Sequence, residues 1–297
     1  MSESGERDGR SHQQREVRER TTSHRVLSKE LDKGGRDENV SGTDHLYGVS
    51  PVRAALIADK RKMEALLVQE GMKMDAKKDK KGAFEIMSLA KKKEIPIQEF
   101  SKHDLNMLSS NRPHQGFILR AHPLTFRKLA KSQALLPQSL EKDCSRSKVI
   151  LALDEVWDPQ NFGALLRTAH FLPGVAEVVV CAKNSAPLSE TVSKASAGAM
   201  ESMEVFSVDN MMKFLENSVL AGWQVVGASL GDGSALLSEI PKHRPTILVL
   251  GNEGHGIRKN VLRQCTHLVR IDGGQADGLD SLNVSVTGGI LLHGLSS

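Results

Sequence analysis

The chain contains an unbroken run of apolar residues, Val149-Ile150-Leu151-Ala152-Leu153. A strand that is buried on both faces has this pattern, and such strands are typical of parallel sheets. Three further strand-like runs follow: Val178–Val180, Val225–Gly227 and Ile247–Leu250. Three stretches of helical periodicity lie between the runs: Phe162–Phe171, Thr191–Met200 and Met211–Val219. This alternation predicts an α/β fold with a mostly parallel sheet that helices cover on both faces.

Three polar or glycine-containing stretches lie where predicted strands and helices meet. The first, Asp158–Gly163, follows the first strand and leads into a helix that carries Arg167. The second, Gly251–Gly256, follows the last of the apolar runs, and the third, Ser281–Asn283, begins the final helix. Open parallel sheets bind ligands outside the carboxyl ends of their strands, and glycines let the backbone approach a ligand closely. We therefore expect a ligand site at this edge, where Glu253 offers a carboxylate to a cationic ligand.

Each of these stretches has an ordinary interpretation when it is taken alone. A single arginine on a helix, such as Arg167, is more often a surface or salt-bridge residue. The segment Gly251–Gly256 by itself is only a loop. Its glycine spacing does not match Gly-x-Gly-x-x-Gly after a first strand, so the fingerprint of a Rossmann dinucleotide site is missing.

The final helix is predicted to span Ser281–Leu295. Its apolar side chains recur near helical spacing and are expected to face a core: Leu282, Val286, Ile290 and Leu291. The hydroxyl of Ser281 is a candidate N-cap. Asn283 and Ser285 are weak helix formers that a plain packing helix seldom carries in its first turn, which favours a functional role for this end.

Composition limits the possible classes of protein. The chain has 297 residues, of which 39% are hydrophobic, and this allows two modest domains and a tail. A formal net charge of +4 is compatible with nucleic acid as a partner without requiring it. No apolar run approaches the roughly 20 residues of a membrane span, so no membrane segment is expected. Aromatic residues make up only 4%, which argues against base stacking on an aromatic platform.

The cysteines and the N-terminal segment bear on the compartment. The 3 cysteines are far apart and form no Cys-x-x-Cys pair, which favours a reducing compartment over disulfides or a zinc site. Residues 1–42 have almost no large apolar side chains and cannot bury a core. Their arginines and serines suit a mitochondrial transit peptide, whereas a solvated tail is the alternative. Five acidic residues contradict the acidic-poor rule for transit peptides: Glu3, Glu6, Asp8, Glu16 and Glu19.

Residues 43–123 predict a small α/β domain. Its expected elements are a helix after Tyr47-Gly48-Val49-Ser50-Pro51, the strand Ala65–Val68, the helix Glu85–Lys93, and strands at Ile95–Ile97 and His114–Leu119. The lysine-rich insertion at 73–81 fits either a solvated face or a phosphate-facing surface. Residues 124–147 are basic, with prolines and serines, and indicate a linker to a second domain at 148–297.

Three segments together resemble the motifs of the SpoU-type RNA 2′-O-ribose methyltransferases of the SPOUT superfamily, in that family's order and at about its spacing. They are Asn161-Phe162-Gly163-Ala164-Leu165-Leu166-Arg167, Leu250-Gly251-Asn252-Glu253-Gly254 and Ser281-Leu282-Asn283-Val284-Ser285. Lys183–Leu188 and Ser193–Ala199 resemble the branch that methylates a guanosine in large-subunit ribosomal RNA. The resemblance covers residues 45–297 and is closest to the mitochondrial rRNA methyltransferase group.

The resemblance implies a trefoil-knotted C-terminal domain that binds S-adenosylmethionine, usually in a homodimer with sites near the subunit interface. Hydrophobic periodicity alone predicts an unknotted sheet, because true knots are nearly absent from folds. Residues 43–123 resemble the family's ribosomal-protein-like RNA-binding domain. By position, the catalytic set is Asn161, Arg167, Glu253, Ser281 and Asn283. The cofactor-binding set is Gly251, Asn252, Gly254, Ile271 and Leu282, and no metal ligand is implied.

One segment departs from the family pattern. Between Ile271 and Ser281 the family often has Pro-Met and a glycine, whereas this chain has Asp272-Gly273-Gly274-Gln275-Ala276-Asp277-Gly278. The resemblance therefore predicts a longer and more flexible loop next to the cofactor here.

Transfer of a methyl group to a ribose hydroxyl requires the hydroxyl to lose its proton, and Arg167 is the family's usual answer. A guanidinium has a pKa above about 12 and is a poor base. Two interpretations stay open: Arg167 accepts the proton with help from a phosphate, or it stays charged and stabilises the developing alkoxide. Cys181 and Cys265 lie outside the motifs, although methylation of a base carbon would need a thiolate beside the methyl donor.

The expected partners are large-subunit ribosomal RNA and a second copy of the chain, with neither a membrane nor a metal. Mitochondria are the expected compartment and the cytoplasm is the alternative. Two other functions stay open: a tRNA methyltransferase of the same chemistry, and a non-catalytic RNA-binding factor in ribosome assembly.

Overall fold

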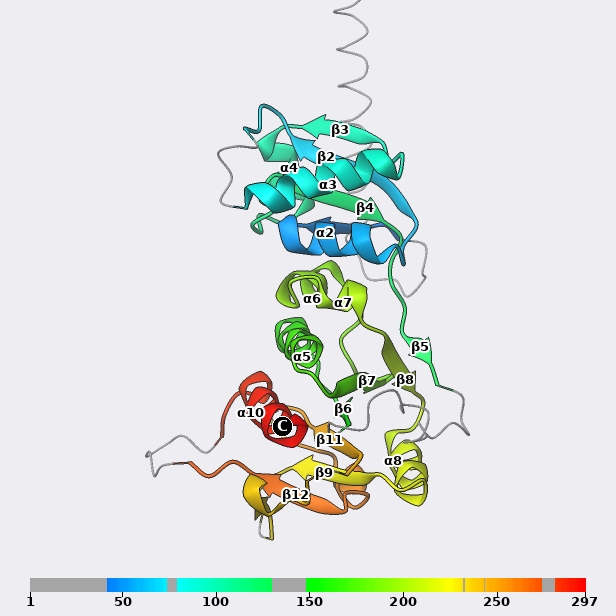
Figure 1. Ribbon diagram of the computed structural model, residues 1–297, viewed down its shortest axis with the longest axis vertical. Helices are drawn as coiled ribbons and strands as arrows, with labels where there is room; N and C mark the ends of the chain where they lie inside the picture. The colour runs from blue at the N-terminus through cyan, green and yellow to red at the C-terminus, as the bar shows by residue number, and fades with distance from the viewer. Residues whose placement is uncertain (1–41, 74–78, 130–147, 232, 243, 274–280) are drawn as a thin grey trace, which may run out of the picture. The chain divides into compact units, whose positions relative to one another are not determined.

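The computed structural model in Figure 1 describes residues 42–73, 79–129, 148–231, 233–242, 244–273 and 281–297. The predicted tail, except Gly42, therefore lies outside the described residues. So do the middle of the lysine-rich insertion and most of the predicted linker. From Thr43 onward, the described residues belong to one compact unit.

A sheet of four strands, here called the small sheet, lies in the first half of the chain. Its strands are β1 (Asp44–Tyr47), β2 (Met63–Gln69), β3 (Ile97–Phe100) and β4 (Phe117–Ala121), in the order β1-β4-β2-β3. β4 is antiparallel to both of its neighbours, whereas β2 and β3 are parallel. The accompanying helices are α2 (Val49–Ala58), α3 (Lys80–Lys92) and α4 (Lys102–Leu108).

Alternating side chains of β2 divide the small sheet into two faces. Leu66 and Val68 pack in one apolar cluster with residues of α2 and α3. Ala65 and Leu67 pack in a second cluster with Leu105 of α4. This is the period of two that a strand imposes on its side chains, and both faces are covered because both carry apolar residues. The predicted α/β character of this region is confirmed.

The second sheet, here called the large sheet, has eight strands in the order β10-β12-β9-β11-β6-β7-β8-β5. These are β5 (Arg127–Lys128), β6 (Val149–Leu153), β7 (Val175–Cys181), β8 (Val205–Val208), β9 (Gln224–Ala228), β10 (Ala235–Leu236), β11 (Thr246–Leu250) and β12 (His267–Arg270). Every pairing between them is parallel. Arg127 and Lys128, which the sequence assigned to a linker, form the edge strand β5.

Helices cover both faces of the large sheet, as the apolar runs predicted. The helical segments are α5 (Pro159–Phe171), α6 (Glu190–Ala195), α7 (Ala199–Ser202), α8 (Met211–Leu220), the 3-10 turn η3 (Leu237–Glu239), α9 (Lys259–Leu262) and α10 (Val284–Ser296). Leu151 of β6 packs with Leu165 of α5 and Leu291 of α10. Ile150 of the same strand packs on the other face with Phe214 of α8. Figure 1 shows α5 and α10 on one side of the sheet and α8 on the other.

The strand order reverses between β6 and β11. From β6 the chain adds β7 and β8 on one side, and β9 and β11 then lie on the other. β6 and β11 are direct neighbours, with Leu153 opposite Leu250. The loops that leave these strands therefore begin side by side at the carboxyl edge. Such a reversal is where open α/β sheets bind ligands.

The last helix differs from its prediction in two respects. It begins at Val284, because the Oδ1 atom of Asn283, and not the hydroxyl of Ser281, accepts the hydrogen bond from the Ser285 amide at 2.9 Å. The predicted core stripe is also wrong at three of its four positions: Leu282, Val286 and Ile290 are exposed, whereas Leu291 is buried.

The prediction was wrong at these positions because α10 is rotated about its axis relative to the orientation that the apolar spacing indicated. A different stripe of α10 faces the core: Val284, Gly288, Leu291, Leu292 and Leu295. Gly288 belongs to this stripe because a Cβ there would lie 2.4 Å from Leu165 Cδ2 and 2.8 Å from Leu250 Cδ1. A glycine at the point of closest approach carries no hydrophobic signal, so the spacing of large apolar residues indicated the wrong face.

The predicted helix Thr191–Met200 is two short helices, α6 and α7. Ala197 has φ 52° and Gly198 has φ 88°, and this left-handed pair ends the first helix. Among the described residues, no helix is both long and apolar enough to cross a bilayer.

Replacing Gly288 with valine should destabilise the fold. The added side chain overlaps Leu165 and Leu250, and overpacking of this kind costs about 1–3 kcal/mol. The denaturant midpoint should fall accordingly. Gly289→Ala is the matched control, because no atom lies within 4 Å of the Cβ that it adds. Replacing a glycine in a helix interior with alanine stabilises the helix by up to about 1 kcal/mol where the added methyl group meets no other atom. Equal midpoints for the two variants would contradict the close packing of α10 on α5.

Candidate active site at the carboxyl edge of the large sheet

The loop after β6 delivers the first site residue through a capped helix start. Asp158 caps α5: its Oδ1 accepts from the Gln160 amide at 3.2 Å and its Oδ2 from the Asn161 amide at 3.2 Å. Pro159 occupies the first turn, where the missing N–H costs nothing. Asn161 is thereby held in the first turn of α5, at the edge where β6 ends.

The loop after β11 is folded back on itself around Gly251. The backbones of Asn252 and Gly256 exchange hydrogen bonds, at 3.1 and 2.9 Å. A Cβ on Gly251 would lie 2.3 Å from Gly256 C and from Ile257 N, so only glycine fits there. The Oδ1 atom of Asn252 also accepts the Gly254 amide at 2.8 Å. The loop therefore has one defined conformation, in which Glu253 is exposed.

Three side chains from the three motifs meet at this edge. The Asn161 amide donates to Oε1 of Glu253. The Asn283 amide donates to Oδ1 of Asn161 at 3.1 Å and to Oε1 of Glu253 at 3.3 Å. The carboxylate therefore accepts from both amides, which fixes the orientation of both Asn side chains. We call these three residues the polar triad.

An ion pair between the buried Asp154 and the half-buried Arg258 supports the loops after β6 and β11, and the sequence did not reveal it. Asp154 is 0% exposed and accepts from Arg258, with 2.5 Å between Oδ1 and Nη2 and 3.0 Å between Oδ2 and the Arg258 amide. The hydrogen bond to Asp154 raises the pKa of the Arg258 guanidinium, although burial opposes it. Asp154 directly follows the apolar run of β6, so an acidic residue at the end of a fully buried strand was the available signal.

Glu155 lies in the loop after β6 and links it to the loop after β11. Its backbone carbonyl accepts from Nδ2 of Asn252 at 3.1 Å, and its Oε1 accepts from Nδ2 of Asn184 at 2.5 Å. His255 Nε2 lies 3.4 Å from Glu155 Oε2. Glu155 has φ 64°, a conformation that non-glycine residues rarely adopt. This backbone geometry aims its carbonyl at the neighbouring loop.

Arg167 lies apart from the polar triad, further along α5. It is exposed and makes no hydrogen bond or ion pair with the described residues. It lines a cavity of about 1100 Å3 together with residues of α2, α7 and α10. Gly289 and His293 are the α10 residues in that lining. The guanidinium is therefore available to a ligand that enters the cavity.

The remaining predicted site residues flank the triad. Ser281 is exposed and makes no hydrogen bond within the described part of the chain. Leu282 is 44% exposed beside it. Ile271 is half-buried and packs against the core of the large sheet. Residues 274–280 of the predicted flexible loop lie outside the described residues.

Cys181 and Cys265, the two cysteines among the described residues, lie outside the polar triad. Burial raises the pKa of the Cys265 thiol to about 12, so it stays protonated near neutral pH. Cys181 is buried. Within the described ranges, no three His, Cys, Asp or Glu side chains are grouped so that they could hold a metal ion.

Family models match both parts of the chain. The model of the SpoU rRNA Methylase family matches residues 148–293, which include the polar triad and Arg167. The model described as RNA 2'-O ribose methyltransferase substrate binding matches residues 45–127, which include the small sheet.

Two curated relatives and one solved structure are similar over most of their length. The human mitochondrial rRNA methyltransferase 1 is 39% identical over 85% of this chain and 72% of its own. The 23S rRNA (guanosine-2'-O-)-methyltransferase RlmB of Pseudomonas aeruginosa is 33% identical over 85% and 96%. The AdoMet-bound rRNA methyltransferase of Sinorhizobium meliloti is 22% identical, with a TM-score of 0.65 over 85% and 86%, and shares the fold.

Removing the cation that pairs with Asp154 should destabilise the chain strongly. Arg258→Met leaves a carboxylate that is 0% exposed without its counter-charge. Breaking a fully buried ion pair from one side costs about 3–5 kcal/mol, but the Arg258 side chain is 35% exposed, so the free energy of unfolding should fall by about 1–3 kcal/mol. The control is Arg263→Met, because Arg263 is exposed and its side chain makes no ion pair within the described ranges, with one hydrogen bond to Asn260 at 3.4 Å; its effect should stay within about 0.5 kcal/mol. A similarly small effect for Arg258→Met would mean that its pairing with Asp154 does not stabilise the fold.

Proposed function

The chain belongs to the SpoU rRNA methylase family and is an RNA methyltransferase, and we propose that it makes 2′-O-methylguanosine in the peptidyl-transferase region of large-subunit ribosomal RNA. The observation that carries this proposal is the polar triad of Asn161, Glu253 and Asn283 at the strand-order reversal. Two amides and a carboxylate that they share suit the recognition of a ribose, whose hydroxyls both donate and accept hydrogen bonds.

The ribose is favoured over a base carbon as the acceptor. Methylation of a base carbon would need a thiolate beside the methyl donor, whereas Cys265 holds its proton because of burial. Ser281 and Asn283 are exposed beside the first turn of α10 and provide uncharged hydrogen bonds for orienting the sugar. In this proposal Glu253 orients Asn161 and Asn283, because its Oε1 accepts from both amides.

The loop Gly251–Gly256 fits S-adenosylmethionine as the cofactor. Nothing lies within 4 Å of the position of a Cβ on Gly256, so a ligand has room to approach the backbone there. Leu282, which is 44% exposed, and the half-buried Ile271 supply apolar surface for an adenosyl group. Asn252 and Gly254 hold the loop in shape, at 2.8 Å between Oδ1 and the amide. When bound, the cofactor supplies an activated methyl group.

We assign to Arg167 the stabilisation of the developing alkoxide. Its guanidinium carries a permanent positive charge and makes no ion pair with the described residues, so the charge is free for the substrate. The alternative, that Arg167 takes the proton with the help of a phosphate, needs a strongly lowered pKa. In the first assignment the guanidinium of Arg167 keeps its proton. It lowers the activation barrier of methyl transfer by direct electrostatic attraction to the alkoxide.

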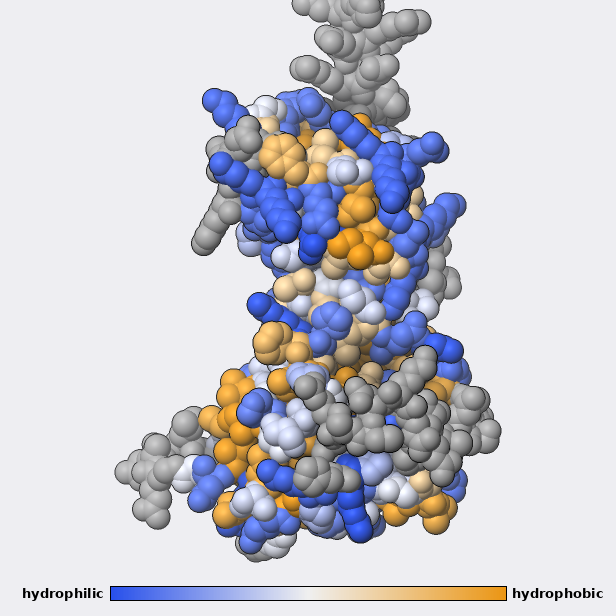
Figure 2. All heavy atoms as spheres, viewed as in Figure 1, coloured by the Kyte–Doolittle hydropathy of each residue, from blue (hydrophilic) through white to orange (hydrophobic). Residues whose placement is uncertain are grey.

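The protein is further proposed to act as a homodimer, in which a second copy of the chain covers exposed apolar side chains. Three apolar side chains of α10 and the preceding turn are exposed, and Phe171 at the end of α5 is 83% exposed. Figure 2 shows hydrophobic side chains gathered over the region of α10 on the face in view. Large apolar side chains that are exposed together are typical of an interaction site. Because Arg167 lies on α5 as well, a second copy on this face would bring the site close to the subunit interface.

The ribosomal substrate and the compartment follow from the relatives. A similar bacterial protein is named for a guanosine in 23S rRNA and a similar human protein for mitochondria. We therefore place this chain in mitochondria, acting on large-subunit ribosomal RNA. A tRNA target and a non-catalytic assembly role are outcomes that the experiments below would detect.

Labelled cofactor and unmodified large-subunit rRNA test the reaction itself. After digestion to nucleosides, the label should appear on the ribose of guanosine. Label on another ribose would overturn the target, label on a base would overturn the chemistry, and label only on tRNA would favour the tRNA alternative. Absence of both label and cofactor binding would favour the assembly factor.

Arg167→Ala should lower kcat by about 100-fold or more, because it removes the charge that stabilises the alkoxide. Cofactor affinity should change by no more than a few-fold. Arg167→Lys retains a positive charge and should keep an intermediate rate. Equal losses of rate and cofactor affinity in Arg167→Ala would instead assign Arg167 a structural role.

A reporter protein fused behind residues 1–42 tests the compartment. The fusion should enter mitochondria if this segment is a transit peptide. If the reporter stays in the cytosol while the full chain is imported, the signal lies elsewhere in the chain. If the full chain also stays outside, the proposed compartment is wrong.

A further inference from the structure

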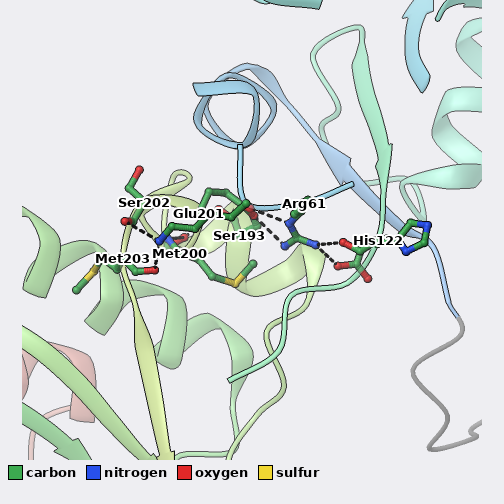
Figure 3. A network of polar contacts seen from close by, with 10 residues as sticks. Arg61, His122, Ser193, Met200, Glu201, Ser202 and Met203 are labelled. Carbon is green, nitrogen blue, oxygen red and sulfur yellow. Dashed lines mark hydrogen bonds and ion pairs between the residues drawn. The ribbon is translucent and has the colours of Figure 1, made fainter. Parts of the chain in front are cut away.

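A buried ion pair joins the small-sheet region to the large-sheet region. Arg61 lies between α2 and β2, and Glu201 lies in α7. Their contact is bidentate: Nε is 2.8 Å from Oε2 and Nη2 is 3.0 Å from Oε1. The side chains are 0% and 1% exposed. Figure 3 shows the guanidinium facing the carboxylate.

Three further groups form hydrogen bonds with the two side chains of the Arg61–Glu201 pair. Nη1 of Arg61 donates to Oδ2 of Asp44 at 2.6 Å and to the backbone carbonyl of His122 at 3.0 Å. The hydroxyl of Ser193 donates to Oε1 of Glu201 at 2.8 Å. We call these five residues the Arg61 cluster. Buried charges are tolerated only when they are paired in a specific geometry, so the cluster restricts the two regions to one arrangement.

Contacts around the cluster hold the same arrangement. Lys60 Nζ donates to the backbone carbonyls of Ser202 and Met203, at 3.1 and 3.0 Å. Lys194 of α6 donates to the carbonyl of Pro113 at 3.0 Å and lies 5.6 Å from the centre of the Tyr47 ring. Lys60 of the small-sheet region is thus bound by carbonyls of the large-sheet region, and Lys194 of the large-sheet region by a carbonyl of the small-sheet region.

The backbones also approach each other closely. A Cβ on Gly198 would lie 2.5 Å from the Cβ of Ala54 and 2.9 Å from the carbonyl oxygen of Ser50. Gly198 has φ 88°, so glycine satisfies both the turn between α6 and α7 and the contact with α2. Even one methyl group at this position would push α2 and α7 apart.

We propose that the Arg61 cluster fixes the distance between the RNA-binding region and the methyl-transfer site, which makes Glu201 a positioning residue for methylation. This inference rests on the proposed function. An RNA that contacts both regions gains affinity only if their spacing matches the RNA, since the second contact then forms at a high effective concentration. An RNA that contacts only the methyl-transfer site does not depend on the spacing.

Glu201→Gln in the full chain tests this proposal with two RNAs. One is a folded rRNA domain that contains the target, and the other is a short fragment around the target nucleotide, too short to contact both regions. The variant should raise KM for the long RNA by about tenfold or more. KM for the short RNA and the affinity for S-adenosylmethionine should not change. An equal loss of activity on both RNAs by a Glu201→Gln variant that is folded would assign Glu201 a merely structural role and would overturn the proposal.

Two further variants complete the design. Glu216→Gln makes the same chemical change at an exposed ion pair within α8, 2.9 Å from Lys213, and should leave both KM values unchanged. Ala54→Leu adds bulk against Gly198 while every charged group of the Arg61 cluster stays in the chain, and it should reproduce the loss that is specific to the long RNA. It decides the matter if Glu201→Gln does not fold. Unchanged KM values in both test variants would overturn the positioning role alone, whereas a wild-type chain inactive on both RNAs would overturn the proposed function as well.

Discussion

The pairing of β6 with β11 is the constraint on which the site depends. The two strands are parallel neighbours, and the Asp154 amide extends their ladder by donating to the carbonyl of Leu250 at 2.8 Å. Because both strands end at the same level, the loops that follow must start in contact. Asn161 and Glu253 can therefore form a hydrogen bond although 92 positions separate them in the chain. A register shift of one residue would separate the motifs and also reverse the buried faces of both strands.

Charge is distributed unevenly around this edge of the sheet. The buried carboxylate of Asp154 is paired with Arg258, whose Nε also lies 3.5 Å from Oε1 of Glu155. The triad shares one carboxylate between two amides, whereas Arg167 has no partner among the described residues. The side chains that we propose to orient the substrate are thus already hydrogen-bonded to one another, and the guanidinium of Arg167 is left available. This division fits a reaction in which negative charge develops on a sugar oxygen.

The sequence predicted what local patterns encode. Apolar runs revealed β6 and β11, because strands buried on both faces must be apolar at every position. It did not predict the buried face of α10, since Gly288 marks that face and carries no hydrophobic side chain. It also missed the ion pairs of the buried Asp154 and the buried Glu201, because a charged residue in sequence gives no sign of a partner 104 or 140 positions away. The knot and the limits of the domains stay predictions from the resemblance.

The error in α10 is informative about function. Val286 and Ile290 are 49% and 41% exposed, although their spacing is that of residues selected for burial. Burial of apolar surface contributes roughly 25 cal/mol per Å2, so a periodic apolar stripe left in water is a cost that a partner surface would remove. α5, which packs on α10, begins at the polar triad and ends at the exposed Phe171, with Arg167 between them. One helix thus connects the site to the surface that a second copy would cover, and assembly of the proposed homodimer would act directly on the placement of Arg167.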